Sequence, residues 1–269
     1  MIKDGIYFDE KLERRRKRML KIKIYGGLTI FFLLIIGAGY LVVYSSVFQI
    51  TRIDVDINAD LRGFETQIIE DLKILFTNQS KISSFLGPDN ILIWESGDDI
   101  EQFKKNNPLI AYLVISKDYI ERKIKIEVKG REKYGVWCKS AINYCWWFDK
   151  SGIIFAEAPM VEGALINKVN DSTGRDLKIG DTIIEQRFLD NLLKIFAVLE
   201  ETNLGKGFLN LENLSLQEII FNSPLGFKIY FSLRFDPRFS LAGIKSIKEI
   251  GLEKMDYIDF RVENRVYYK

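Results

Sequence analysis

The sequence has 269 residues, of which 47% are hydrophobic and 28% charged, and its formal net charge is +2. This composition predicts a folded chain, and the nearly balanced charge favours neither nucleic acid nor an acidic partner. The sequence contains no histidine, which excludes histidine-based catalysis and nearly all zinc sites.

A basic run precedes a long apolar segment near the start of the sequence. Lysines and arginines crowd residues 11–23, and no charged residue lies between Ile24 and Thr51. About 20 apolar residues cross the ~30 Å hydrocarbon core of a bilayer, so 24–46 is predicted to be a transmembrane helix. Its length favours an uncleaved anchor over a cleaved signal or a buried core helix. The positive-inside rule then assigns 1–23 to the cytoplasm and the body to the other side, as in a single-pass type II protein of the cell membrane.

The body is predicted to be α+β, with two domains after the anchor. The first, 47–129, shows the order β-α-α-β-β, judged from apolar periodicity and turn residues. We predict strands over Phe48–Asn58, Ile110–Ile115 and Ile120–Val128, and helices over Glu65–Phe76 and Asp98–Lys105.

The second domain, 130–269, is predicted to be β-rich with flanking helices. We predict strands over Val136–Trp137, Tyr144–Phe148, Ile153–Phe155, Leu214–Phe221, Phe227–Leu233 and Tyr257–Tyr268, and helices over Phe188–Leu199 and Leu241–Glu249.

The two cysteines, Cys138 and Cys145, flank a polar turn in one predicted hairpin. Without histidine they cannot complete a four-ligand zinc site, so a disulfide or two free thiols remain. Opposed strand positions outside the cytoplasm favour the disulfide. The nearby Trp137, Trp146 and Trp147 are expected to pack in the core rather than to form a binding site.

Several stretches, in this order behind a span, resemble the bacterial cell-division family called FtsQ in some species and DivIB in others. Arg131 and Trp137 match the family's E-R-x-P-x-A-x-W pattern, whereas Gly130 and Lys133 depart from it. The further matching stretches are Pro108–Ile110, Ile124–Val128, Phe148–Phe155, Tyr257–Arg261 and Asn264–Val266.

This resemblance implies a POTRA (polypeptide-transport-associated) domain at 47–129, which serves recruitment to the division machinery, and a β-domain at 130–269. It also implies a non-enzymatic scaffold at the division septum that helps regulate septal peptidoglycan synthesis. The last strand of the family's β-domain receives a strand from the small partner FtsB (DivIC), which comes with FtsL. Here the implied partner-binding residues are Val262, Glu263, Asn264, Arg265, Val266, Tyr267 and Tyr268.

The position of this strand at the close of the sequence is a second reason to expect an open edge, and the alternative is an interior strand with both edges paired.

No pattern in the sequence predicts catalysis, a metal site, a cofactor or a small-molecule substrate. The adjacent carboxylates of Asp98-Asp99 and Glu200-Glu201 point different ways in any regular structure, whereas acid–base pairs face each other across a cleft. Two other functions stay open. One is a different membrane-anchored POTRA protein in secretion or envelope assembly, and the other is a membrane-anchored cell-wall enzyme.

Overall fold

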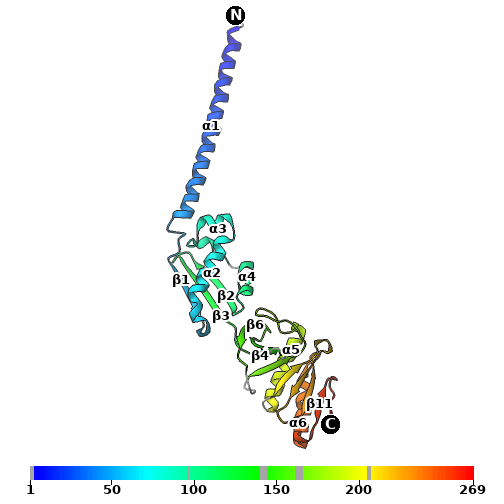
Figure 1. Ribbon diagram of the computed structural model, residues 1–269. Coiled ribbons are helices and arrows are strands. Elements are labelled where there is room, and N and C mark those ends of the chain that lie inside the picture. The colour runs from blue at the N-terminus through cyan, green and yellow to red at the C-terminus, as the bar shows by residue number, and fades with distance from the viewer. Residues whose placement is uncertain (1–2, 96, 140–143, 161–165, 205–206) are drawn as a thin grey trace. The chain divides into compact units, whose positions relative to one another are not determined.

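The computed structural model describes residues 3–269 apart from 96, 140–143, 161–165 and 205–206. It is a mixed α+β fold that divides into two compact units (Figure 1). The first unit comprises the chain up to Gly97 together with Val114–Glu127. The second comprises Asp98–Leu113 and Val128–Lys269.

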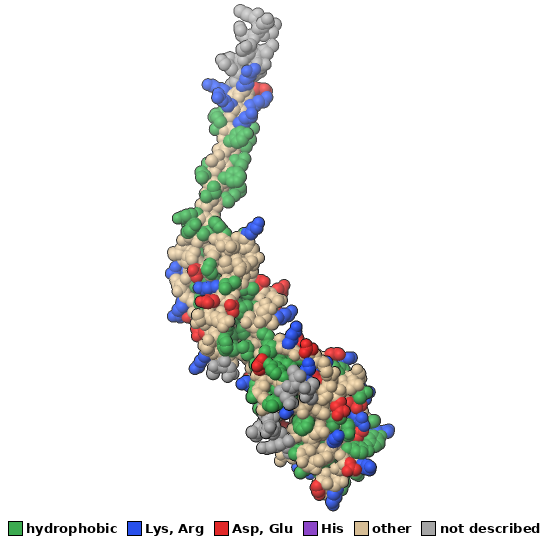
Figure 2. Space-filling model, in the orientation of Figure 1, with side chains coloured by type: hydrophobic (Ala, Val, Ile, Leu, Met, Phe, Trp, Pro, Cys, Tyr) green, Lys and Arg blue, Asp and Glu red, His purple; other side chains and the backbone are tan. Residues whose placement is uncertain are grey.

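The first unit begins with α1 (Lys3–Tyr44), an uninterrupted helix that carries the predicted apolar segment. Its portion Glu13–Tyr44 is long and apolar enough to cross a membrane. Apolar side chains such as Leu33 and Leu34 are exposed along it, as Figure 2 shows by the band of hydrophobic side chains below the basic residues. A helix that is apolar over this length, with none of the apolar segment buried against the described chain, is typical of a lipid-facing helix.

Side chains from later in the chain hydrogen-bond to the last carbonyls of α1 and to the turn after it. Asn90 Nδ2 donates to the carbonyl of Val42 at 2.9 Å, and Gln49 Nε2 donates to that of Val43 at 2.8 Å. Arg122 Nη1 donates to the carbonyl of Ser46 at 2.7 Å. These bonds satisfy acceptors that a helix end leaves free, and they tie α1 to the folded part of its unit.

A three-stranded sheet has the order β1-β3-β2. Its strands are β1 (Arg52–Ile57), β2 (Ile110–Asp118) and β3 (Lys123–Gly130), and the helices of this region are α2 (Glu65–Asn78), α3 (Lys81–Leu86) and α4 (Asp98–Asn106). The sequence prediction missed α3, so the β-α-α-β-β order is incomplete. None of its side chains is buried, and it therefore shows no core-facing periodicity.

A second correction concerns Ile120, which the alternation of residue types over Ile120–Val128 predicts to lie in a strand. Ile120 is 95% exposed and lies in the turn before β3, where Asp118 Oδ1 accepts hydrogen bonds from the amides of Ile120 and Glu121. Arg122 follows with a positive φ of 53°, and regular pairing begins only at Lys123.

The second unit contains a sheet of nine described strands in the order β12-β11-β10-β9-β8-β7-β4-β5-β6. The strands are β4 (Gly135–Lys139), β5 (Tyr144–Phe148), β6 (Ile154–Ala158), β7 (Asn167–Asp171), β8 (Phe208–Leu211), β9 (Glu218–Asn222), β10 (Lys228–Ser232), β11 (Tyr257–Phe260) and β12 (Tyr267–Tyr268). The helices α5 (Gln186–Thr202) and α6 (Ser240–Ile250) bury their apolar faces in the same core as one face of this sheet.

Two strands of this sheet, β7 and β8, escaped the sequence prediction. The segment Asn167–Asp171 offers one apolar side chain, Val169, between polar residues, so no alternation marks it. Its last residue, Asp171, is buried because Trp137 Nε1 and Arg175 Nη2 donate to its carboxylate at 3.0 and 2.8 Å. Bonds from Trp137 of β4 and from Arg175, four residues after Asp171, thus hold a strand that its own side chains do not predict.

The predicted strand Tyr257–Tyr268 is wrong as one continuous element. It is a hairpin in which β11 and β12 pair antiparallel, with Ile258 opposite Tyr268 and Asp259 opposite Tyr267. The residues between them turn back, with Arg265 N donating to the Val262 carbonyl at 3.1 Å. Of the seven predicted partner-binding residues, Tyr267 and Tyr268 alone form a described strand.

Candidate partner-binding site

The strand β12 is the end strand of the nine-stranded sheet. Lys269 N donates to the Tyr257 carbonyl at 3.2 Å, and Tyr257 N donates to the Lys269 carbonyl at 3.3 Å. Since successive residues of an antiparallel strand bond to opposite sides, the N–H and C=O of Tyr268 face away from β11. Within the described chain no strand pairs with that outer side, so β12 presents a backbone donor and acceptor to a further strand.

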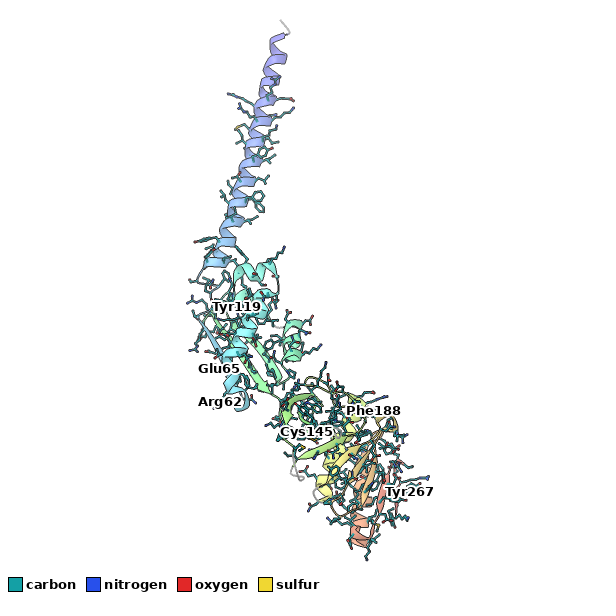
Figure 3. All side chains as sticks on the ribbon, in the orientation of Figure 1. Arg62, Glu65, Tyr119, Cys145, Phe188 and Tyr267 are labelled. Atoms are coloured by element: carbon teal, nitrogen blue, oxygen red, sulfur yellow. A yellow bond between two sulfur atoms is a disulfide. The ribbon has the colours of Figure 1, made fainter. Side chains whose placement is uncertain are left out.

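The seven residues predicted from the sequence are all exposed, in a turn followed by this strand. Asn264 sits at the tip with a φ of 57°, a left-handed conformation that asparagine tolerates better than most residues. Tyr267 and Tyr268 are 47% and 51% exposed, and Figure 3 shows Tyr267 at the surface of the second unit.

The two tyrosines lie on opposite faces of the sheet. Tyr268 is paired with Ile258, which points into the core with α5 and α6, whereas Tyr267 is paired with Asp259 on the other face. A strand added at β12 can therefore contact an amphipathic ring on each of its faces.

A charged cluster fixes β11, the strand on which β12 rests. Arg261 donates to Asp259 Oδ2 at 2.6 Å and to Glu218 Oε2 of β9 at 3.0 Å. Its guanidinium also lies 4.8 Å from the ring centre of Tyr230 in β10. The cluster thus connects three neighbouring strands on the face opposite the core.

Burial disfavours the charged form of Asp259. Hydrogen bonds from the side chain and backbone of Arg261, together with its positive charge, nevertheless hold the pKa of Asp259 below its ordinary value. The hydrogen bond to Asp259 raises the pKa of Arg261 in turn. Both groups therefore stay charged at neutral pH, and the cluster stays intact.

The helix α6 supports the same hairpin from the core side. It connects β10 to β11, which are parallel. A Cβ atom on Gly243 would lie 3.1 Å from the ring of Phe260 and 3.8 Å from Cβ of Val266, so the helix packs closely here because residue 243 has no side chain.

The sequence analysis did not identify Glu218, Tyr230 and Gly243. It named Asp259 and Arg261 only as part of a stretch that resembles the family, without a structural role. The I-D-F-R stretch could have suggested the pair Asp259–Arg261, since residues two apart on a strand share a face.

Cys138 and Cys145 lie opposite each other in β4 and β5, and the structure joins them in a disulfide with a Cα–Cα distance of 4.0 Å. The polar turn between them, 140–143, lies outside the described residues. Trp137 and Trp146 are buried, whereas Trp147 is partly exposed beneath the Lys133 ammonium, 5.1 Å from its ring centre.

A cavity of about 580 Å³ lies in the second unit, lined by Lys133, Tyr134, Trp147 and Glu200 among others. Glu200 is the one carboxylate in the described lining. Burial, and secondarily the charge of Glu200, raises the pKa of Tyr134. Glu201, the residue after Glu200, forms an ion pair with Lys245 at 2.8 Å, so the two adjacent carboxylates do not act together in the cavity. Among the described residues no group of three acidic or cysteine side chains could hold a metal.

No family model and no curated protein matches this chain.

Proposed function

We propose that this protein is a membrane-anchored, non-enzymatic scaffold of the bacterial cell-division machinery, which binds an extended strand of an FtsB/DivIC-like partner at the outer edge of β12. The observation that carries the proposal is that no described strand pairs with the outer edge of β12 at Tyr268, and that exposed tyrosines lie on both faces of this strand. In strand addition the main chain supplies hydrogen bonds while side chains select register and partner.

The anchor and its orientation belong to the same proposal. The helix α1 places the charge-free run Ile24–Val47 directly after a basic segment, a distribution that favours an N-terminus inside and a body outside. The disulfide Cys138–Cys145 supports an extracytoplasmic body, since disulfides persist in oxidising compartments.

The resemblance supplies the rest of the proposed role. An FtsL-like protein comes with the FtsB-like partner, the assembly helps regulate septal peptidoglycan synthesis, and the region 47–129 acts as a POTRA domain in recruitment to the septum. The three-stranded sheet with helices between its first two strands is compatible with that domain type, with α3 as an addition.

The two alternatives are less well supported. A secretion or envelope-assembly protein with a POTRA domain would not need the hairpin β11–β12 with its I-D-F-R pattern. A membrane-anchored cell-wall enzyme would need a convergent carboxylate or serine site, and the cavity of about 580 Å³ in the second unit has Glu200 as the one carboxylate in its described lining.

The proposal is tested with the full chain in detergent and a purified FtsB/FtsL-like pair. We expect co-purification with the intact chain and none after truncation behind Arg261, with thermal melting to show that the truncated β-domain still folds. Normal co-purification of the folded, truncated chain would refute the β12 site.

Topology is tested separately with a reporter that is active only outside the cytoplasm. Fusion after Lys269 should give activity, and fusion within residues 1–23 should give none. The reverse pattern would refute the orientation.

A further inference from the structure

The short helix α3 exposes its apolar residues and has no buried side chain. Ile82 and Phe85 are 73% and 71% exposed, and their spacing of three residues puts them on one face of the helix. Ser80 caps the helix by accepting a hydrogen bond from the amide of Ser83 at 3.0 Å. The capped helix therefore presents two large apolar side chains outward instead of packing them in the core.

The turn between β2 and β3 exposes a second apolar pair. Ile120 is 95% and Tyr119 is 55% exposed, although both belong to a turn whose backbone is held firmly by Asp118. These two tips of the unit, the capped helix and the turn bonded by Asp118, thus each present two neighbouring apolar side chains at its surface.

Both tips lie beside the point where α1 ends, within the same compact unit. The helix α3 contacts α1 directly, and the loop after α3 reaches Val42 through the 2.9 Å hydrogen bond of Asn90. The β2–β3 turn reaches Ser46 through the 2.7 Å bond of Arg122. Figure 1 shows α3 next to the lower end of α1, and Figure 3 shows Tyr119 at the end of the unit nearer α1, with Arg62 and Glu65 at the other end.

The end of α1 is also the place where a spanning helix leaves the hydrocarbon. At 1.5 Å per residue, a ~30 Å core that begins near Ile24 ends at about Val43. The exposed rings of Tyr40 and Tyr44, 4.9 Å apart, mark the same level, because tyrosine prefers the membrane interface. With α1 spanning the bilayer as proposed above, the residues that contact its end come to lie near the level of the lipid headgroups.

We infer that the first unit lies against the bilayer, with Ile82 and Phe85 of α3 and Tyr119 and Ile120 of the β2–β3 turn inserted into the interface around α1. Burying these side chains in the acyl boundary removes apolar area from water, and this favours one fixed orientation of the unit on the membrane. The inference rests on the anchoring by α1 in the proposed function.

The test uses spin labels on single cysteines in the full chain, reconstituted in phosphatidylcholine vesicles with a minority of phosphatidylglycerol. Cys138 and Cys145 are joined, so the introduced thiol alone reacts. Labels at Phe85→Cys and Ile120→Cys report the tips, and Leu34→Cys reports the middle of α1. Phe64→Cys is the matched control, because Phe64 is also an exposed apolar residue, 45% exposed, and lies between Arg62 and Glu65.

Collisions with oxygen, which enters lipid, are compared with those of a water-soluble nickel complex. We expect the oxygen-to-nickel ratio at 85 and 120 to be several-fold higher than at 64 and lower than at 34. Ratios at 85 and 120 equal to that at 64, with a lipid-like value at 34, would overturn the inference and leave the anchor intact. A water-like value at 34 would overturn the anchor itself. Shielding of 85 and 120 from both reagents would show a protein contact, such as a second copy, and would also overturn it.

Discussion

The two end strands of the large sheet are protected to different degrees. At β6, the outward N–H of Ile154 donates to the Asp181 carbonyl at 2.9 Å, and its carbonyl accepts from Gly180 N at 2.8 Å. At β12, no described strand pairs with the outward N–H and C=O of Tyr268. Unpaired edges invite pairing with other chains, so the edge at Tyr268, which no described strand pairs, is the place where a partner strand can bind.

The turn before β6 is also built more firmly than the hairpin before β12. Asp149 accepts hydrogen bonds from the amides of Ser151 and Ile153, each at 3.0 Å, and from Arg131 Nη1 at 2.6 Å. Gly152 follows with a φ of 76°, and a Cβ there would lie 2.9 Å from Leu189. Substitutions on the β6 side should therefore lower stability, whereas those on the outer side of β12 should lower binding.

The largest expected effect is on binding. Tyr268→Pro removes a donor on the outer side of β12 without removing one that bonds to β11, so the fold is retained while a paired ladder cannot form. We expect partner affinity to fall by about 100-fold or more, roughly 3 kcal/mol. Val266→Pro, one alternation earlier, should act in the same way. Titration calorimetry with the partner pair measures the loss, and circular dichroism checks folding.

The matched control for this prediction is Tyr267→Pro, which removes a donor on the inner side and should destabilise the β11–β12 hairpin itself. Equal effects of Tyr267→Pro and Tyr268→Pro on both stability and binding would contradict the assignment of the Tyr267 N–H to the β11 side of β12 and of the Tyr268 N–H to its outer side.

The next largest effect is on stability at the β6 side. The side chains of Arg131 and Asp149 are 12% and 11% exposed, and removal of one partner leaves the other charge poorly solvated. Arg131→Ala should cost about 3 kcal/mol of unfolding free energy in urea denaturation and leave partner affinity unchanged. A binding defect as large as that of Tyr268→Pro, in protein that is still folded, would remove the distinction between the two sides.

Loss of the disulfide between β4 and β5 should have a somewhat smaller effect. In the chain-entropy model a bridge that closes so short a loop stabilises by about 2–3 kcal/mol. Cys138→Ser with Cys145→Ser should lower the melting temperature, and reduction of the native protein should lower it equally. Two reactive thiols in the unfolded, unreduced protein would show instead that the bridge does not form.

Tyr267→Ala should weaken binding by about 1–2 kcal/mol, or roughly 5- to 30-fold, because a rigid ring is lost from the interface. Tyr144→Ala in β5 is its counterpart toward the β6 side, since Tyr144 is also exposed, at 37%. Surface plasmon resonance should show unchanged affinity for Tyr144→Ala, and equal losses would point to a general surface effect.

The smallest effect is on pH dependence. The folded-state pKa of Asp259 is lowered, so the stability it contributes is present above its unfolded-state pKa of about 3.9 and is lost as pH falls towards the folded value. Thermal melting between neutral pH and pH 3 should show a steeper loss for the native protein than for Asp259→Asn. Parallel curves would contradict the lowered pKa.

How much the sequence predicts depends on where the stabilising contacts come from. The helix Phe188–Leu199 was predicted well, because its own apolar periodicity faces the core, and it lies within α5. The strand β7 was missed, since it has one apolar side chain of its own and its last residue, Asp171, is bonded by the distant Trp137 as well as by the nearby Arg175. The closing hairpin was read as one strand because alternation continues through Val262–Val266, while the turn at Asn264 depends on a single left-handed residue.

The central claim is that the backbone of Tyr268 is free in the unbound protein and paired in the complex. The direct measurement is amide hydrogen exchange of the full chain labelled with ¹⁵N-tyrosine, without and with a saturating FtsB/FtsL-like pair. In the unbound protein we predict fast exchange of the Tyr268 amide, and in the complex we predict strong protection of it. The Tyr257 amide, already bonded to the Lys269 carbonyl, should be protected in both states. Fast exchange at Tyr268 in the saturated complex would contradict the account.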